Sequence, residues 1–343
     1  MYRLIKNSNK DIQQVVDIYN QITGKNRTVS QHKWEWFCSP YKNLSYIIQK
    51  NNGEIIGHHG LLRVDISYQE KKYKMAKTEN TFIKEGYGPL YPKNEMAMHK
   101  EYLPEFDVLM TTAAQGVTRR IREKLGYEYF ADYVTHLSLI DFSFLLSRFR
   151  NKVIIALLRS VLPSVNLLFS NKSVNNEFEH KVEPLNGIHL EKIEDLYSSV
   201  KHKYGFMQTR STDYLRYRLL NNPYLTFDVL LLYKKNDLVG VLIFSVYQNK
   251  LTVEDVLFRE KQQLQEMLNR LCNHARKNKL ANLVVFTTLK NSILDNKYKY
   301  FIRRRAGEGS SVVMIKNNIK DEFKKELNVK NFYFTGLTTE GVR

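Results

Sequence analysis

Alternating and helix-periodic apolar positions divide the first part of the chain into short elements. The pattern predicts a strand at residues 2–5, an amphipathic helix at 11–22 and a second helix at 30–37. The period of two that follows predicts an antiparallel meander of three strands, the last of which ends in TENTFI at residues 78–83.

A glycine turn and a helix follow this meander. The turn Glu85-Gly86-Tyr87-Gly88 lies between the last strand and an apolar, helix-periodic run from about residue 92 to 102. Glycine permits positive φ, and Pro89 and Pro92 suit the first turn of a helix. A strand, a glycine turn and a helix N-terminus together present free N–H groups, so they predict an anion site; a plain surface turn is the alternative.

The rest of the first half continues the alternation, and the second half repeats it. A strand at 106–112, a basic helix at 116–126 and a strand at 127–137 complete the order βααβββαβαβ. In the second half we expect helices, strands or runs of strands at residues 211–220, 227–258, 262–278, 281–289, 292–304 (a helix) and 310–316.

Local features support the repeat. Pro40 and Pro223 each end an aromatic helix, and Gly57 and Gly240 lie equally far beyond those two prolines. A period near 180 residues predicts two similar domains packed side by side.

An apolar segment with interspersed arginines, residues 141–177, connects the two halves. Three interpretations fit it: a helical linker packed across both domains, a basic amphipathic surface that contacts a membrane through residues 141–171, or a helix that binds a partner. It is too interrupted to span a bilayer. We therefore expect domains at 1–140 and 178–343, each an α/β (α+β) unit with a mixed, mostly antiparallel sheet flanked by helices.

Composition sets the broad class. With 343 residues, 43% of them hydrophobic, the chain can build two packed cores. Cys38 and Cys272 make neither a disulfide framework nor a metal motif, and the first residues lack a signal-peptide core. We expect no metal site and a cytoplasmic location, with peripheral membrane contact as the alternative.

The formal net charge of +18 favours a polyanionic partner, such as a nucleotide cofactor, a nucleic acid or an anionic membrane. The basic residues are spread along the chain, so a general lysine-rich bias explains the charge equally well. We expect no DNA partner.

The element order, the central strand–glycine turn–helix and the doubled pattern resemble the GNAT superfamily of acyl-CoA-dependent N-acetyltransferases in its tandem form. The local features are GEIIGHHGLL, TENTFI, EGYGP before a helix, and REKLGYEYF. The helices that end at Pro40 and Pro223 are similar to segments of tandem relatives associated with bacterial surface-sugar acylation. The resemblance implies acetyl-CoA, or another acyl-CoA, as cofactor and a small-molecule amine or amino sugar, in some cases nucleotide-linked, as substrate.

Three positions depart from the family pattern. Ile83 stands where the phosphate loop usually carries Arg or Gln, and Arg122 stands where many members have a tyrosine that protonates the leaving group. After Phe258 the second half reads REKQQLQE and has no glycine turn. The resemblance therefore implies that the first half binds the cofactor and that the second is structural or shapes the substrate site.

The resemblance also assigns cofactor contacts. A backbone N–H of the splayed central strand would polarise the thioester carbonyl, the turn would hold the pyrophosphate, and nearby basic side chains would add charge. The expected cofactor-binding residues are Phe82, Ile83, Gly86, Tyr87, Gly88, Lys93 and Arg119.

Four residues are candidates for the chemistry. Glu79 is our first choice for general base, with an ion pair to a basic residue of a neighbouring strand as the alternative. His58 and His59 face opposite sides of a strand, so either could act as base, and a structural histidine is the alternative. Tyr91, or Tyr87, could protonate the leaving thiolate, with ordinary packing as the alternative.

We expect an acyl-CoA-dependent N-acetyltransferase, with an amino sugar of a surface polysaccharide as an acceptor suggested by analogy alone. A first alternative is a Fem-type aminoacyl or peptidyl transferase, which also pairs two GNAT-like domains and uses aminoacyl-tRNA. A second alternative is a non-catalytic binding protein with the same fold.

Overall fold

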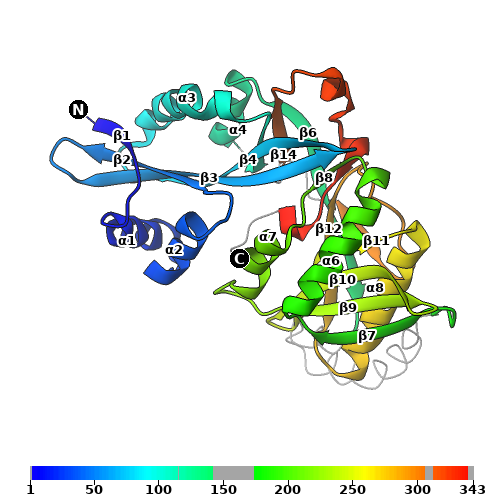
Figure 1. Ribbon diagram of the computed structural model, residues 1–343. Helices are drawn as coiled ribbons and strands as arrows, with labels where there is room; N and C mark the ends of the chain where they lie inside the picture. The colour runs from blue at the N-terminus through cyan, green and yellow to red at the C-terminus, as the bar shows by residue number, and fades with distance from the viewer. Residues whose placement is uncertain (1, 115, 142–173, 306–311, 339–343) are drawn as a thin grey trace, which may run out of the picture.

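The computed structural model describes residues 2–114, 116–141, 174–305 and 312–338 (Figure 1). The elements of the first half are β1 (Tyr2–Lys6), α1 (Ile12–Thr23), α2 (Val29–Phe37), β2 (Leu44–Lys50), β3 (Ile55–Tyr68), β4 (Lys71–Ile83), α3 (Tyr91–Tyr102), β5 (Val108–Ala114), α4 (Gly116–Lys124) and β6 (Glu128–Leu139).

The second half has a similar order. Its elements are β7 (Glu179–Pro184), α6 (Gly187–Val200), β8 (Phe206–Gln208), α7 (Thr212–Leu215), the π-helix η5 (Arg216–Leu220), β9 (Asp228–Lys234), β10 (Asp237–Tyr247), β11 (Lys250–Phe258), α8 (Lys261–Lys277), β12 (Leu283–Leu289), β13 (Ile302–Arg305), β14 (Val312–Asn317), β15 (Phe332–Tyr333) and the short helix η8 (Gly336–Thr338). It differs from the first half in that β8 is added after its first helix, irregular backbone stands in place of a helix like α4, and further short elements follow β14.

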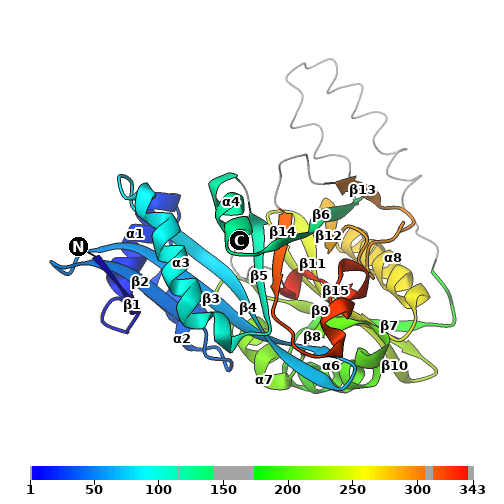
Figure 2. The ribbon, with the colours of Figure 1, turned by 90° about the horizontal axis from the view of Figure 1, so that it is seen from above.

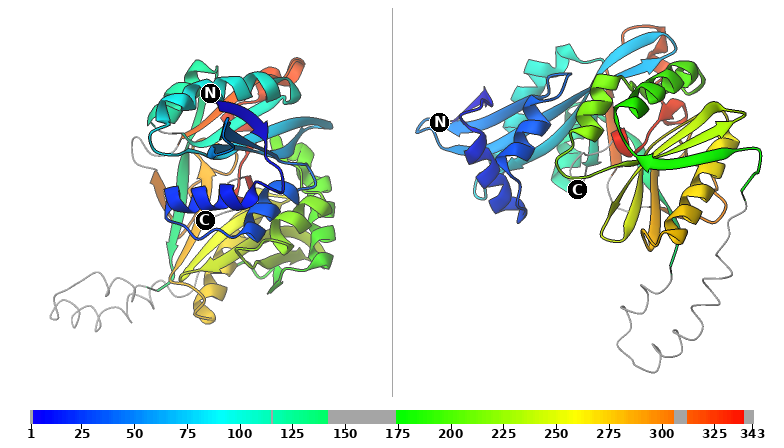
Figure 3. Two further views of the ribbon diagram at one scale, coloured as in Figure 1. Left: turned by 90° about the vertical axis from the view of Figure 1, so that its left-hand side faces the viewer. Right: turned by 60° about the horizontal axis from the view of Figure 1, so that its bottom comes forward.

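The strands form one continuous hydrogen-bonded path in the order β1-β2-β3-β4-β5-β14-β6-β12-β11-β10-β9-β7. In the first half, α1 and α2 cover one face of the sheet and α3 and α4 the other (Figure 1). In the second half, α6 and α8 both pack on β10 and β11. The blue-to-teal first half and the green-to-orange second half lie side by side (Figure 3). This mixed, mostly antiparallel arrangement confirms the predicted fold class.

The two halves exchange their last strands. β14 comes from the second half but lies between β5 and β6 (Figure 2). β6 is long enough to serve both sheets: its first part pairs with β14, and residues 133–139 pair with β12. A division of the chain at residues 140 and 178 therefore does not separate the two sheets, and the predicted domain boundaries are too simple.

Equivalent residues meet where the halves touch. The rings of Trp34 and Tyr217 stack with centroids 5.1 Å apart, and the Trp34 indole N–H donates to the Tyr217 carbonyl over 3.0 Å. Each residue lies six positions before the proline that ends its helix, Pro40 or Pro223. The contact therefore lies near a pseudo-twofold axis that relates the repeats.

One predicted element is absent from the described residues. We expected a helix at 292–304, but this segment is irregular up to β13. The Asp295 carboxylate accepts from the Asn291 N–H over 2.7 Å and is bound by Arg303 over 2.5 and 2.8 Å, and the Asn296 side chain accepts from the Lys297 N–H. Such local side-chain bonds compete with helical hydrogen bonds.

Within the described ranges, no helix is long and apolar enough to cross a membrane. Residues 142–173, which hold nearly all of the segment expected to contact a membrane or to link the domains, lie outside these ranges.

Candidate functional site

The parallel strands β4 and β5 diverge in the middle of the first half. They pair from Met75 to Thr78 on β4 and from Val108 to Thr111 on β5. Beyond these pairs, the described partners of β4 lie on β3 and those of β5 on β14. We call the place where the two strands diverge the first parting. Residues 80–83 of β4, which border it, are half-buried, whereas residues 75–79 are buried.

Strand β4 has a bulge at the first parting. The register with β3 shifts here, so Asn80 and Thr81 stand opposite the single residue His59. Asn80 has a left-handed backbone with φ of 47°, a conformation that is uncommon for residues other than glycine but that asparagine adopts more readily than most. Because a bulge leaves one residue of the ladder unpaired, a backbone N–H can face the parting here.

The bulge adds a second position at which a backbone N–H can polarise the carbonyl. Phe82 and Ile83, which we expected to supply the N–H, pair in register with His58 and Gly57 of β3. Every second N–H of β4 points away from β3 in such a pair. The expected role of Phe82 and Ile83 therefore stays a prediction beside that of the bulge.

The glycine turn leads from the first parting into α3. Gly86 has φ of 84°, and a Cβ at Gly86 or Gly88 would meet no heavy atom within 4 Å. The Tyr87 N–H donates to the Lys84 carbonyl over 3.1 Å, and the Leu90 N–H donates to the Tyr87 carbonyl over 2.9 Å. The turn thus uses two of the expected N–H groups itself, and its outer side is open to a ligand.

Of the side chains expected to hold phosphate, Lys93 and Arg119 are exposed. Arg119 forms a surface ion pair with Glu123 over 3.0 Å. The Lys50 ammonium lies over the Tyr87 ring, 5.1 Å from its centroid. The side chain of Tyr91 lies outside the described part of the structure.

The two adjacent histidines lie on opposite faces of β3, as predicted. His59 belongs to a buried group beneath α3: it is hydrogen-bonded to the Thr81 hydroxyl (2.9 Å) and stacks on Tyr102, which is bonded to His99 (2.9 Å). Arg122, where a tyrosine was expected from the family pattern, is also buried on this side, over the Tyr127 ring.

His58 is buried on the α2 side. Its Nδ1–H donates to the Asn80 carbonyl over 2.8 Å, so its Nε2 accepts from the Ser45 hydroxyl over 2.8 Å. Burial lowers the pKa of His58 to about 3. The ring is therefore neutral near pH 7 with both nitrogens engaged, which argues for a structural role rather than that of a base.

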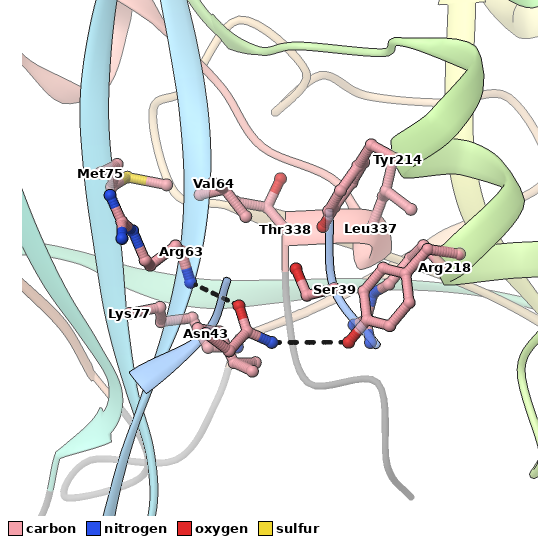
Figure 4. A pocket seen from close by; sticks show the side chains of 12 residues that line it. Ser39, Asn43, Arg63, Val64, Met75, Lys77, Tyr214, Arg218, Leu337 and Thr338 are labelled. Atoms are coloured by element: carbon pink, nitrogen blue, oxygen red, sulfur yellow. Dashed lines mark hydrogen bonds between the residues drawn. The ribbon is translucent and has the colours of Figure 1, made fainter. Parts of the chain in front are cut away.

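A small cleft lies between the two halves, on the α2 side of β4 (Figure 4). Its walls come from the end of α2, from β3 and β4, from α7 and η5, and from η8, and they consist of Ser39, Asn43, Leu62, Arg63, Val64, Met75, Lys77, Tyr214, Tyr217, Arg218, Leu337 and Thr338. The Asn43 amide accepts from the Arg63 backbone N–H over 2.9 Å and donates to the Glu35 carbonyl over 2.6 Å. Asn43 thus fixes the junction of α2 and β3.

The π-helix explains why two consecutive residues reach this cleft. The Asn221 N–H donates to the Arg216 carbonyl, five residues earlier, over 2.9 Å. The wider turn places both Tyr217 and Arg218 on the cleft wall; single-turn π-helices are frequent at functional sites.

Glu79 connects this cleft to the first parting. It is the first residue of β4 beyond the pairing with β5, and it forms a buried ion pair with Lys77. Residues two apart share one face of a strand. The ion pair was the predicted alternative for Glu79, but its partner lies on the same strand. Apart from Glu79, the Lys77 ammonium, which has three N–H groups to donate, has no partner among the described residues.

The second half has an equivalent parting, between β11 and β12, which the C-terminal segment closes. Parallel pairing ends at Val253, so Glu254 and Asp255 match Glu79 and Asn80. The Tyr333 hydroxyl donates to the Val256 carbonyl over 2.6 Å. The Thr335 hydroxyl donates to Asp255 over 2.8 Å, and residues 254–258 are all buried. The second parting is therefore filled by the chain itself.

Sequence reasoning missed three features of the site: the Lys77 ammonium, Asn43 and the cleft residues of η5. It also missed Arg27, which binds Asn80, although a signal was present. The dipeptides Arg27-Thr28 and Arg210-Ser211 stand thirteen residues before the two helix-ending prolines. In each repeat the hydroxyl caps the helix and the buried arginine reaches the residue after the glutamate at the parting.

No protein family model and no curated protein sequence matches the chain. Solved structures do. A GCN5-related N-acetyltransferase from Anabaena variabilis is 13% identical over 96% of this chain and 75% of its own, with a TM-score of 0.64. One from Kribbella flavida is 10% identical over 92% and 70%, with a TM-score of 0.57.

The N-myristoyltransferase of Saccharomyces cerevisiae, solved with bound myristoyl-CoA, is also similar. It is 10% identical over 92% of this chain and 79% of its own, with a TM-score of 0.58. At this level of identity the likeness establishes the fold, and the chain has the GNAT fold.

Proposed function

We propose that the protein is an acyl-CoA-dependent N-acyltransferase whose donor site is the first parting and whose acceptor site is the cleft between the halves. The observation that carries the proposal is the place of Glu79. It lies where β4 leaves β5, beside the bulge at Asn80 and beside the cleft-lining Lys77. The fold shared with acyltransferases, one of them solved with bound myristoyl-CoA, supports the same reading.

The chain's residues fit an acyl-CoA at the first parting. The open glycine turn and the N-terminus of α3 suit a pyrophosphate, and the half-buried residues 80–83 leave the edge of β4 accessible. When bound, acyl-CoA supplies an activated thioester carbonyl. The backbone N–H of the bulge donates to the carbonyl oxygen, where negative charge develops.

Glu79 then serves as the proton acceptor. An amine enters the cleft as an ammonium ion and must lose a proton before it can attack. Glu79 can take this proton directly or through a water molecule. When the new C–N bond forms, the C–S bond would break, and the leaving CoA thiolate would take up the second proton of the nitrogen. The neighbouring Lys77 holds the carboxylate in a buried ion pair beside the cleft.

The cleft supports an amino sugar as the acceptor. Lys77 and Glu79 lie side by side, so an acceptor with nitrogen and oxygen on neighbouring carbons can reach both residues at once. Asn43, Ser39 and Tyr217 add further polar groups to the cleft walls. A role in surface-polysaccharide biosynthesis is part of this proposal.

Isothermal titration with acetyl-CoA and with myristoyl-CoA tests the donor site. We expect micromolar binding of at least one of them, lost in Gly88→Trp and kept in Lys192→Trp, a control on the exposed face of α6. Salt-dependent binding of tRNA without binding of either thioester would favour an aminoacyl transferase instead. Binding of neither ligand class would favour a non-catalytic protein.

Thiol release from acetyl-CoA tests the chemistry. With glucosamine as acceptor, Glu79→Gln should lower turnover by about 10²–10⁴-fold and leave the dissociation constant of acetyl-CoA nearly unchanged. Lys77→Met should weaken glucosamine more than cyclohexylamine, which lacks the neighbouring hydroxyl. Unchanged turnover in Glu79→Gln would remove Glu79 from the mechanism.

A further inference from the structure

Asn80 is held by a buried group of three side chains from three different elements. Its side-chain oxygen accepts from the Arg27 guanidinium over 3.3 Å, and its amide donates to the Glu35 carboxylate over 2.8 Å. Its backbone carbonyl accepts from His58 Nδ1–H over 2.8 Å. Both ends of the side chain and the backbone carbonyl of this one residue are thus fixed.

The holding group is itself rigid. Arg27 and Glu35 form an ion pair over 3.2 Å with side chains only 2% and 4% exposed. The Arg27 guanidinium lies 3.8 Å above the Tyr19 ring, and the Arg27 backbone is bonded at both its N–H and its carbonyl to the Asn20 side chain. A buried pair of this kind adds little net stability for its cost, so what it specifies is geometry.

What this geometry fixes is an unfavourable backbone conformation at the first parting. Asn80 is the left-handed residue of the β4 bulge. Backbone conformations of this kind persist only where the surroundings determine them, and they concentrate at functional sites. The second half keeps the arginine, Arg210, but pairs it with Asp255 in a strand that has no left-handed residue at this place.

We propose that Arg27, Glu35 and His58 are positioning residues for the acyl transfer. They hold Asn80 in its left-handed conformation, so that a backbone N–H of the bulge keeps its direction toward the thioester carbonyl. This inference rests on the proposed function, because it requires an acyl-CoA at the first parting. The three residues do not touch the reacting atoms and act through the backbone of Asn80.

The test uses Asn80→Gly in the full chain. Glycine adopts the same φ without strain but removes both side-chain bonds. The matched control is Asn236→Gly, in the exposed β9–β10 turn, where φ is 72°. The readout is the infrared stretching frequency of the thioester carbonyl in bound, ¹³C-labelled acetyl-CoA, which reports how strongly the protein polarises it and needs no acceptor.

We expect parent protein and Asn236→Gly to lower the carbonyl frequency equally. Asn80→Gly should lose more than half of that shift while its dissociation constant for acetyl-CoA changes by less than about threefold, and Glu35→Gln, which keeps the shape of the network, should lose an intermediate part. If Asn80→Gly and Glu35→Gln both lower the carbonyl frequency as much as the parent protein does, the inference is overturned and the proposed function still stands. Failure of the parent protein to bind acetyl-CoA would overturn the proposed function and this inference with it.

Discussion

Two parallel strands diverge at each of the two partings. The second parting is covered by another segment of the chain, whereas the first has open space beside it. In the first, Asn80 and the three residues after it are half-buried, and the flanking turn has open space around its glycines. In the second, the equivalent residues from Asp255 to Phe258 are each about 1% exposed, and the C-terminal segment covers them. The two halves thus present one parting with open space beside it and one that the chain closes.

The two partings also differ in how fully their charged side chains are paired within the protein. Arg210 and Asp255 are fully paired to each other and to Thr335, which ties the C-terminal segment to the second half. In the first half a neutral asparagine stands in the place of Asp255, and the cation that faces the cleft, Lys77, still has N–H groups to donate. The second half has used its polar groups for stability, whereas the first half retains groups that can bind a substrate.

The largest test of this difference is Arg210→Met. Removal of one partner from a fully buried ion pair leaves the Asp255 carboxylate uncompensated, which should lower the free energy of unfolding by about 3–5 kcal/mol. Urea denaturation followed by circular dichroism measures it. The control, Lys201→Met, breaks an ion pair with the exposed Glu70 and should change stability by less than about 1 kcal/mol. Equal effects of the two variants would show that the second parting is not locked by this pair.

The second test concerns the pH dependence of stability, to which buried histidines of the first half contribute. Burial lowers the pKa of His58 to about 3 and that of His32 to about 2, while the second half has Leu215 and Val241 at the equivalent positions. Below about pH 6.5 these two histidines become protonated in the unfolded chain but stay neutral in the folded chain. Stability should therefore be complete above pH 6.5 and fall on acidification, by on the order of 1 kcal/mol per pH unit for each histidine.

The measurement is the urea midpoint between pH 7 and pH 4.5. The double variant His32→Leu/His58→Val, which copies the second half, should flatten the curve. A slope that is the same in parent and variant would assign the acid sensitivity to other groups, such as His136, whose pKa burial lowers to about 4.

The smallest expected effect comes from alanine substitution of one glycine beside each parting. A Cβ at Gly336 would lie 2.9 Å from the Glu254 carbonyl oxygen and carboxylate, so Gly336→Ala should displace the C-terminal segment and cost about 1–3 kcal/mol. A Cβ at Gly88 meets nothing within 4 Å, so Gly88→Ala should stay within about 0.5 kcal/mol of the parent protein. Thermal unfolding of the two variants decides; a Gly336→Ala protein as stable as the parent would mean that the second parting has unfilled space.

Sequence reasoning was strongest where the periodicity was regular. The last strand of the predicted meander ends at Ile83, as β4 does, and the helix predicted at 11–22 differs from α1 by one residue at each end. The helix expected at residues 292–304 does not form, because the carboxylate of Asp295 takes part in local hydrogen bonds that hydrophobic periodicity does not reveal. The two glycines on which the predicted repeat rests, Gly57 and Gly240, stand where a Cβ would lie 2.8 and 2.9 Å from a neighbouring side chain.

The site was less predictable than the elements around it. That Lys77 and Glu79 share a face follows from their spacing on a strand, but that this face borders a cleft depends on Tyr217 and Thr338, which are distant in the sequence. The bulge at Asn80 left no local signal, since asparagine is tolerated both in regular strands and at positive φ. The strand exchange was not predictable, because the pattern of β14 fits either sheet equally well.

The exchange of strands determines when this protein can fold during its synthesis. A nascent chain leaves the ribosome from its N-terminus, yet the gap between β5 and β6 stays open until residues 312–317 emerge. For most of translation, two strand edges of the N-terminal region therefore lack a partner and are exposed to wrong pairing. A chain built in this way depends on the synthesis of β14, and termination before residue 312 would release a product in which the edges of β5 and β6 lack this strand.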